Sequence, residues 1–313
     1  MIKYVDYYVP QARVTLETVF DNISGTGKLP AAFETQEDGI HFFRNVTGIQ
    51  EVAHAAEITE AEQLHILLSR FFDSNITTPF ETELFILIGD DRNKGDRMAN
   101  LGHYLQHTFK MENADVLVLQ GNHCSNVEYA VSYAENILAS GNVSNIIIAA
   151  ANKLLRHEDR IIGSYAIQGD GAGLVYLNAD KEDGVLVHGK HSLTKGMLYQ
   201  ANVNEDNSLL LCKNYMLCIA GLMKKYKLKP AFISNVIIQN ANHLLVTQCL
   251  TSLGFTREQV FTDNLTAYGH LDAIDFLVNL RSLMEKSPAK NTKMISFGTG
   301  WAGSNISLYL EQV

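Results

Sequence analysis

Cys124 stands between a short apolar run and a long helical pattern, an arrangement that can present a thiol for nucleophilic attack. Residues 115–119 predict a buried strand, and Gly121 marks the polar turn that follows it. Apolar residues at helical spacing run from 127 to 140 and stop at Gly141, a typical helix C-cap. Backbone N–H groups without partners at the start of a helix favour the thiolate form of a cysteine placed there. The pattern therefore indicates either a cysteine nucleophile or a buried core cysteine, and it leaves both open.

The remaining cysteines and the histidine pairs do not suggest a metal site or a disulfide framework. Four cysteines are present, and none of them forms a Cys-x-x-Cys pair. Cys212, Cys218 and Cys249 lie among apolar residues at helical spacing, which is typical of core positions. His103 and His107 are four residues apart on one predicted helix, but no third ligand accompanies them in the sequence. We expect no metal, and we expect reduced thiols, as in a cytoplasmic protein.

The composition excludes several classes of protein. The 313 residues are 46% apolar, enough for a large core, and they carry a formal charge of −9. Phosphate binding needs clustered Lys and Arg, so this acidic chain predicts no nucleic-acid partner. The sequence has no run of about 18 apolar residues that would span a membrane, and no early segment is patterned like a signal peptide. These features predict a soluble cytoplasmic protein without a membrane partner.

Predicted strands alternate with predicted helices, which favours mostly parallel sheets with helices on their faces. The strand, polar turn, helix and glycine stop around Cys124 recur at 236–254, which suggests an internal duplication. Residues 168–173 are rich in glycine but precede a strand, so they fit close packing better than phosphate binding. Residues 42–49 predict a loop. The other predicted strands are 2–8, 84–88, 145–150, 174–177, 185–188, 294–297 and 304–310, and the other predicted helices are 14–20, 60–72, 98–109 and 209–228.

The turns and glycine motifs of the chain also follow the order and spacing of a known family. These segments are Val46-Thr-Gly-Ile49, Cys124 in its strand-to-helix turn, Gly169-Asp-Gly-Ala-Gly173, Gln239-Asn-Ala-Asn242, Gly269-His270 and Phe297-Gly-Thr-Gly-Trp301. Over essentially its whole length the chain resembles the β-ketoacyl-acyl-carrier-protein synthase III branch of the thiolase superfamily. The resemblance implies an α/β, thiolase-like five-layer αβαβα fold built from two duplicated halves. We expect residues 1–180 to form the half with the nucleophilic cysteine, and 181–313 the half with the other active-site residues.

By this resemblance, Cys124 attacks an acyl thioester and carries the acyl group, without a separate cofactor. The backbone N–H groups of Cys124 and Thr299 match the oxyanion-hole donors of the family. The acyl donor is then a thioester of acyl-carrier protein or of coenzyme A. Family members are usually dimers, so we expect a homodimer, or a heterodimer with a paralogue.

The chain departs from the family at two catalytic turns. The family's His-Gln-Ala-Asn turn corresponds to residues 239–242, so Gln239 takes the histidine position. His270 takes the position of the family's asparagine, provided that one residue is inserted nearby. A cysteine nucleophile needs a neighbouring base or cation, which His270 supplies in this register. Gln239 can donate a hydrogen bond but is not a base near neutral pH.

Polar neighbours are expected to support this site. Asp272 and Asp275 follow His270, and they either orient its imidazole or face solvent. Asn242 belongs to the same turn as Gln239. His243 either packs or caps at the start of a helix, or becomes the functional imidazole if the register is shifted.

Two further positions concern the acyl donor. Phe42 and Val46 match the positions at which family members carry a Trp and an Arg that grip the adenine of coenzyme A. Stacking on Phe42 is retained while the Arg contact is lost, which leaves room for a carrier-protein donor. Arg97 lies in a charged run near the expected acyl pocket, where it either meets a polar acyl group or faces solvent.

These observations predict an acyltransferase or condensing enzyme in specialised, polyketide-like or fatty-acid-like biosynthesis. It would form an acyl thioester on Cys124 and transfer the acyl group to a second substrate. The alternative is a catalytically degenerate partner subunit of an active paralogue, or an acyl-binding protein. Retention of Cys124 favours the enzyme, whereas Gln239 in place of the family's histidine favours the degenerate subunit.

Overall fold

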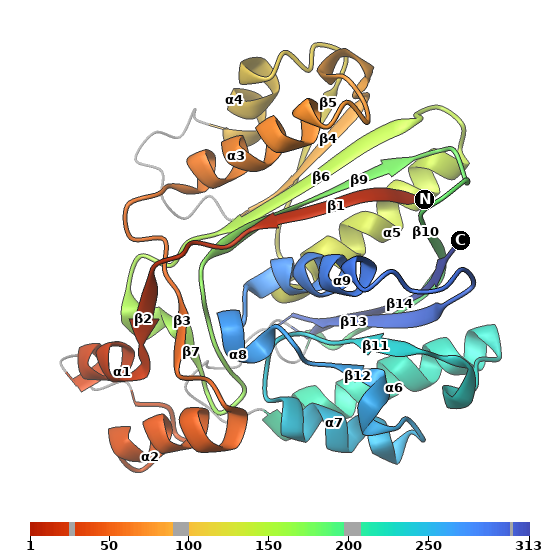
Figure 1. The fold of residues 1–313 in the computed structure, drawn as a ribbon. Helices are drawn as coiled ribbons and strands as arrows, with labels where there is room; N and C mark the ends of the chain where they lie inside the picture. Colours follow the sequence, from red (N-terminus) through yellow and green to blue (C-terminus); the bar gives the residue numbers. More distant parts are fainter. Residues whose placement is uncertain (25–28, 90–99, 197–207, 301–302) are drawn as a thin grey trace.

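The structure is a computed structural model that describes residues 1–24, 29–89, 100–196, 208–300 and 303–313 (Figure 1). The predicted donor-binding residue Arg97 lies outside the described residues. In the part of the chain that is described, we find no helix with the length and apolar character needed to cross a membrane.

Ten strands form one hydrogen-bonded sheet, and each half of the chain contributes five of them. The first half orders its strands β1-β9-β6-β4-β5, and the second half orders its strands β10-β14-β13-β11-β12. The two sets join where β1 pairs with β10 at Ile2 and Val185. The strands are β1 (Ile2–Tyr8), β4 (Leu84–Ile88), β5 (Asp115–Leu119), β6 (Asn145–Asn152), β9 (Gly171–Asn178), β10 (Val185–Thr194), β11 (Asn235–Ile237), β12 (Val260–Phe261), β13 (Lys293–Thr299) and β14 (Ser304–Gln312).

The expectation of mostly parallel sheets is wrong. In each half the three outer strands are parallel, because helices connect them. The two inner pairs of each half are antiparallel: β9 with β1 and β6, and β14 with β10 and β13. The short turn between β13 and β14 permits only an antiparallel pair.

Helices cover the sheet in three layers, which gives the expected five-layer αβαβα arrangement (Figure 1). The first outer layer packs on β4, β6 and β9, and the second outer layer packs on β11, β13 and β14. The middle layer lies between the two halves of the sheet and packs on both. The outer helices are α3 (Glu60–Asp73) and α4 (Leu101–Thr108) on one side, and α6 (Ser208–Tyr226) and α7 (His243–Ser252) on the other; the middle helices are α5 (Asn126–Ala139) and α9 (Asp275–Glu285).

The strand order shows which segments of the two halves are equivalent. Strand β5 matches β12, and α5 matches α9, because each pair holds the same place in its half. The sequence pattern paired residues 115–141 with residues 236–254. This pairing is wrong, because the strand in the second segment, β11, matches β4 and not β5. The expected boundary between 180 and 181 falls in the connection between β9 and β10, and it stays a prediction.

A smaller region beside the main sheet contains the remaining elements. Residues 42–49, expected as a loop, include a π-helix at Phe42–Thr47, because its Phe43 packs into an aromatic cluster. Strand β5 is not buried as expected, since it forms an edge of the sheet. The other elements are β2 (Arg13–Thr15), α1 (Leu16–Ser24), α2 (Gln36–His41), β3 (Glu51–Ala53), β7 (Ile161–Ile162), β8 (Ala166–Ile167) and α8 (Leu265–Tyr268).

Candidate active site

Cys124 lies in a tight turn between β5 and α5. The turn is a short 3-10 helix, η3 (His123–Ser125), that leads directly into α5. Gly121 and His123 both adopt the left-handed backbone conformation, with φ of 93° and 47°. A histidine in this conformation is uncommon, and such strained residues gather at functional sites.

The thiol of Cys124 is not set up as a thiolate in the resting site. Burial raises its pKa well above the ordinary value, and the carboxylates of Asp272 and Asp275 raise it further. This outweighs the favourable effect of the helix start on which the sequence-based expectation rested. Nucleophilic attack therefore requires a base that takes the thiol proton as the reaction proceeds.

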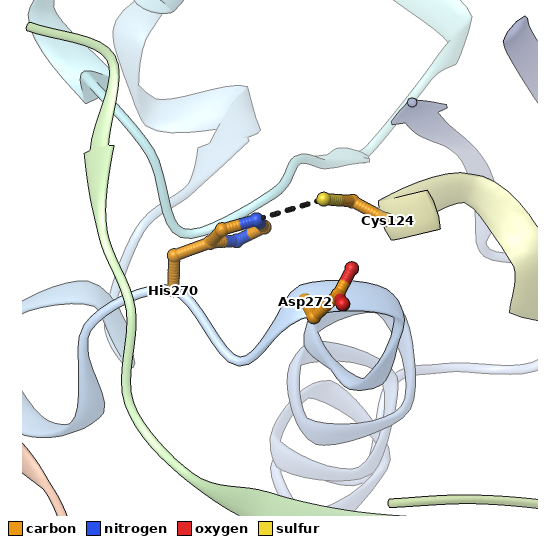
Figure 2. A group of neighbouring side chains, drawn as sticks. All are labelled: Cys124, His270 and Asp272. Atoms are coloured by element: carbon orange, nitrogen blue, oxygen red, sulfur yellow. Dashed lines mark hydrogen bonds between the residues drawn. The ribbon is translucent and has the colours of Figure 1, made fainter. Parts of the chain in front are cut away.

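His270 is placed to be that base. Its Nε2 lies 3.1 Å from Cys124 Sγ, and the ring is fully buried (Figure 2). The preceding Gly269 has φ of 71°, and a Cβ there would lie 2.6 Å from Val52 Cγ1. Only glycine fits this turn without a shift of its neighbours.

The glycine-rich motif at 169–173 holds the backbone of His270. The His270 N–H donates to Ile167 O at 2.9 Å, and the Gly169 N–H donates to His270 O at 2.8 Å. A Cβ on Gly169 would lie 2.5 Å from the carbonyl oxygen of Tyr268. The expected use of these glycines for close packing is confirmed, and it bears directly on the position of the imidazole.

Asp275 fixes the orientation of the His270 ring. Its Oδ2 lies 2.5 Å from His270 Nδ1 and also accepts the Asn240 N–H at 2.7 Å. Its Oδ1 accepts the Leu271 N–H at 2.8 Å. A carboxylate on Nδ1 keeps the proton there, so Nε2 is left to accept the proton of the Cys124 thiol.

The same contact tunes the imidazole. Burial alone lowers the pKa of His270, but the charge and hydrogen bond of Asp275, with a contribution from Asp272, outweigh burial and raise the pKa above its ordinary value. A more basic imidazole is a better acceptor for a thiol whose own pKa is raised. Asp275, His270 and Cys124 thus form one hydrogen-bonded chain of the kind that activates nucleophiles in acyl transfer.

Asp272 does not orient the imidazole, which corrects one of the expected supporting roles. Its carboxylate lies instead beside the thiol, and one ligand atom from each of Cys124, His270 and Asp272 falls within 4.8 Å of the others (Figure 2). This set of atoms also has the chemistry that Zn²⁺ prefers. Asp272 has φ of 57°, which turns the chain sharply between His270 and α9.

Gln239 serves the backbone on both sides of the nucleophile. Its Nε2 donates to Cys124 O at 3.0 Å and to Thr299 O at 3.2 Å. Its Oε1 accepts the Thr299 N–H at 3.2 Å. The side chain therefore holds the Cys124 turn against the end of β13, and its donors do not point at a substrate. The Thr299 N–H, expected as an oxyanion-hole donor, is already bonded to Gln239.

The remaining expected residues lie apart from the Cys124–His270 pair. Asn242 caps α7 by accepting the Leu245 N–H, and it donates to Ser164 O. His243 begins α7, where burial lowers its pKa, and it lines a different cavity. Phe42 lies in the π-helix with its ring 5.6 Å from that of Phe33, so its expected role in donor binding stays a prediction.

A cavity of about 530 Å³ opens beside the nucleophile. The carboxyl ends of β4 and β6 form one wall, and the turn that carries Cys124 forms another. Asp272, Ala273 and Ile274 close it from the second half of the chain. Ligands commonly bind outside the carboxyl ends of strands in α/β sheets, so this cavity is the natural place for a substrate.

Comparison with known proteins gives the same picture of the chain. A family model described as 3-oxoacyl-[acyl-carrier-protein (ACP)] synthase III matches residues 120–196, and the C-terminal model of the same synthase matches 223–308. A β-ketoacyl-[acyl-carrier-protein] synthase III of Clostridium perfringens is 28% identical over 216 residues, which cover 59% of this chain and 66% of the relative. The synthase III of Aquifex aeolicus is 25% identical over 187 residues, 55% of this chain and 59% of the relative. These alignments span less than two thirds of the length of either relative.

Solved structures resemble the chain over almost its whole length. The 3-oxoacyl-[acyl-carrier-protein] synthase III of Aquifex aeolicus has a TM-score of 0.81 at 20% identity, covering 99% of both chains. Xanthomonas campestris OleA, solved with lauric acid and lauroyl-CoA, has a TM-score of 0.81 at 11% identity, covering 98% of this chain and 97% of its own. ChlB3, described as an acyltransferase, has a TM-score of 0.79 at 16% identity, covering 100% of this chain and 97% of its own. At these identities the likeness establishes the fold.

Proposed function

Because this chain is a β-ketoacyl-acyl-carrier-protein synthase III-like protein of the thiolase superfamily, we propose that it is an acyltransferase that works through a thioester on Cys124. The observation that carries the proposal is the hydrogen-bonded chain from Asp275 through His270 to Cys124. Gln239 takes the position at which the family carries its histidine, and His270 supplies a base from a different turn. This arrangement favours an active enzyme over a degenerate partner subunit.

In the first step, Cys124 takes the acyl group from a thioester donor. His270 Nε2 accepts the thiol proton while Sγ attacks the thioester carbonyl. The carbon–sulfur bond to the donor then breaks, and the imidazolium returns the proton to the departing thiolate. Asp275 stabilises the imidazolium that exists between these two proton transfers.

In the second step, a nucleophile attacks the acyl group on Cys124. His270 takes the proton of the incoming hydroxyl or amine as the new bond to carbon forms. The carbon–sulfur bond breaks, and the Cys124 thiolate recovers a proton from the imidazolium. The same base thus serves both halves of the reaction.

Transfer to a hydroxyl or amine fits the site better than decarboxylative condensation. Condensation needs two donors aimed at a developing enolate, which the family supplies from a histidine and an asparagine. Here the amide of Gln239 is bonded to the backbone of Cys124 and Thr299, and His270 Nδ1 is bonded to Asp275. Neither the Gln239 amide nor His270 Nδ1 is therefore free to donate to a developing enolate.

The donor and the setting follow from the family. Enzymes of this family use acyl-carrier-protein or coenzyme A thioesters and no separate cofactor. We propose the same two donors for this chain, together with a homodimer or a heterodimer with a paralogue. A product of specialised, polyketide-like or fatty-acid-like biosynthesis is consistent with a site that has exchanged its condensing residues.

Intact-protein mass spectrometry tests the proposal. The protein is incubated with coenzyme A and carrier-protein thioesters of different acyl chains, and Cys124→Ala and Cys249→Ala are treated in the same way. The expected result is a mass gain of one acyl group that Cys124→Ala loses and Cys249→Ala keeps. An adduct in none of the mixtures would instead favour the degenerate partner subunit or acyl-binding protein.

A further inference from the structure

Asp272 carries a carboxylate into the active site that the reaction described above does not use. The residue follows His270 by two positions, and its left-handed backbone directs the side chain toward Cys124 (Figure 2). Asp275 already orients the imidazole, so a second carboxylate is not needed for that purpose. A negative charge beside the thiol also disfavours the thiolate, which a site built only for nucleophile activation would avoid.

One oxygen of Asp272 is left without a hydrogen bond. Oδ1 is buried, and among the described residues it has no hydrogen-bond partner. A buried carboxylate oxygen without a donor is costly, so the Asp272 carboxylate keeps hydrogen-bonding capacity that its contact with the Cys124 thiol does not use up. Asp272 also lines the cavity of about 530 Å³ together with His123 and Asn126 on either side of Cys124, so a bound molecule can contact its side chain.

The walls of this cavity are polar enough for a small hydrophilic substrate. Gln120, Asn126 and Asn152 line it together with short apolar side chains such as Ala150 and Ala273. Asn126 accepts the Asn122 N–H and Asn152 donates to Gly169 O, and each amide keeps further hydrogen-bonding capacity for a bound molecule. The cavity therefore fits a polar molecule that presents a hydroxyl or amino group toward the thiol.

We propose that Asp272 binds the acceptor, and that the acceptor is a small molecule with a nucleophilic hydroxyl or amine and a second O–H or N–H donor that hydrogen-bonds to the Asp272 carboxylate. The proposal rests on the proposed function, because it names the second substrate of the same site. In the transfer step, Asp272 holds the acceptor through this second donor, so the hydrogen of the nucleophilic group remains available to His270. His270 Nε2 accepts the proton that is lost as the new bond to carbon forms. The carbon–sulfur bond then breaks, and the proton passes from His270 to Cys124.

The same carboxylate acts against anionic acceptors. Two carboxylates, Asp272 and Asp275, lie near the thiol and imidazole, so a substrate carboxylate in the cavity would meet like charge. An ammonium or a neutral polar group placed against Asp272 meets no such repulsion. Lys153 and Arg156 also line the cavity, so the preference concerns the group that contacts Asp272 and not the cavity as a whole.

Ethanolamine, which offers both a hydroxyl and an amine, is the probe for a test in two stages. The acyl-enzyme is first formed with the thioester that gives the largest adduct, and excess donor is removed. Ethanolamine or glycolate is then added, and loss of the adduct is followed by mass spectrometry. The variants are Asp272→Ala, Asp272→Asn and, as a matched control outside this cavity, Asp183→Asn, whose exposed carboxylate is paired with Lys290.

The expected result separates loading from transfer. Asp272→Ala should load no more slowly than the unaltered protein, because the lost carboxylate disfavours the thiolate, but should transfer to ethanolamine roughly tenfold or more slowly, because a charge-assisted hydrogen bond is lost. Asp272→Asn keeps an accepting oxygen and should recover part of the transfer rate. Asp272→Asn should also reduce the difference between the transfer rates to ethanolamine and to glycolate, while Asp183→Asn should match the unaltered protein.

Equal slowing of loading and transfer in Asp272→Ala, or no change in either, would overturn the proposal. A second readout does not depend on acyl transfer, namely the protection of Cys124 by ethanolamine against alkylation with iodoacetamide. Protection should be present in the unaltered protein and lost in Asp272→Ala. Failure to load with any thioester while protection persists would contradict the proposed function but not acceptor binding at Asp272.

Discussion

His270 Nε2 lies 3.1 Å from Cys124 Sγ, although 146 residues of chain separate the two. Each residue belongs to the connection that joins an outer strand to a middle helix, β5 to α5 for Cys124 and β12 to α9 for His270. These connections are equivalent in the two halves. The repeated strand order therefore brings Cys124 from one half and His270 from the other to the same point between the two halves of the sheet.

Replacement of His270 by Ala should abolish most of the loading of Cys124. The imidazole is the base that accepts the thiol proton, and general bases of this kind contribute roughly 10²–10⁴-fold. The measurement is the rate of acyl-adduct formation by mass spectrometry. His243→Ala serves as the control and should change the rate by no more than a few-fold, since His243 lies at the start of α7 and lines another cavity. The reverse order of effects would show that His243 is the functional imidazole.

Replacement of Asp275 by Asn should slow loading while the fold persists. An amide at this position places an N–H₂ group against His270 or against the N–H groups of Leu271 and Asn240, so the ring loses its fixed tautomer. The loading rate should fall by roughly 10²–10⁴-fold, as in His270→Ala. Circular dichroism and thermal melting check that the variant folds. A folded Asp275→Asn protein with an unchanged loading rate would contradict the role of Asp275.

The pH dependence of loading should report the raised pKa of His270. The imidazole must be neutral to accept the thiol proton, so loading should fall as the pH decreases through the pKa of His270, which lies above the ordinary value of 6.5. Asp275 and Asp272 cause the rise, so Asp275→Asn should move this acidic limb to lower pH. Loading rates measured across the neutral range for both proteins check the sign. An acidic limb that does not move in Asp275→Asn would mean that another group controls it.

Much of the fold follows from local sequence signals. The apolar run at 84–88 and the helical spacing at 60–72 correspond to β4 and α3 within one residue, because each is long, periodic and flanked by turn residues. The parallel character of the sheet was overestimated because strand direction depends on connections far apart in the sequence. Helix α9 is absent from the predicted elements, although Leu277, Leu280 and Leu283 repeat at helical spacing.

The site is predicted less completely than the fold. Cys124 and His270 follow from turns that match a family pattern, whereas the partners of Gln239 depend on tertiary packing that no local pattern contains. Asp275 has one sequence signal, a carboxylate at the first position of an apolar-patterned helix, five residues after the histidine. Asp275 rather than Asp272 contacts the imidazole because of the turn that follows His270, in which Asp272 takes a left-handed conformation.

Replacement of Gln239 by His, the family's residue, should not create a condensing enzyme. An imidazole cannot both donate to Cys124 O and Thr299 O and accept the Thr299 N–H, as the Gln239 amide does. Loss of these buried hydrogen bonds should lower the free energy of unfolding by about 1–3 kcal/mol. Chemical denaturation and a malonyl-thioester decarboxylation assay check the two parts, and Leu244→Ala, at an exposed residue shortly after the same turn, is the control. Gain of decarboxylation at unchanged stability would show that a histidine at position 239 can act in catalysis, and it would contradict the positioning role of Gln239.

Zinc should inhibit loading reversibly. Cys124 Sγ, His270 Nε2 and the Asp272 carboxylate can each offer one ligand atom, and these atoms lie within 4.8 Å of one another. Asp275 on His270 Nδ1 is the outer partner that metal-bound histidines usually have, so Asp275→Asn should weaken Zn²⁺ binding by roughly 10–100-fold. Binding should also weaken as the pH falls, because thiol and imidazole must lose their protons to bind the metal. Calorimetric titration with Zn²⁺ measures the affinity, and loading assays with and without a chelator measure the inhibition. Binding of equal strength in Cys124→Ala would place the metal elsewhere on the protein and contradict this account of the inhibition.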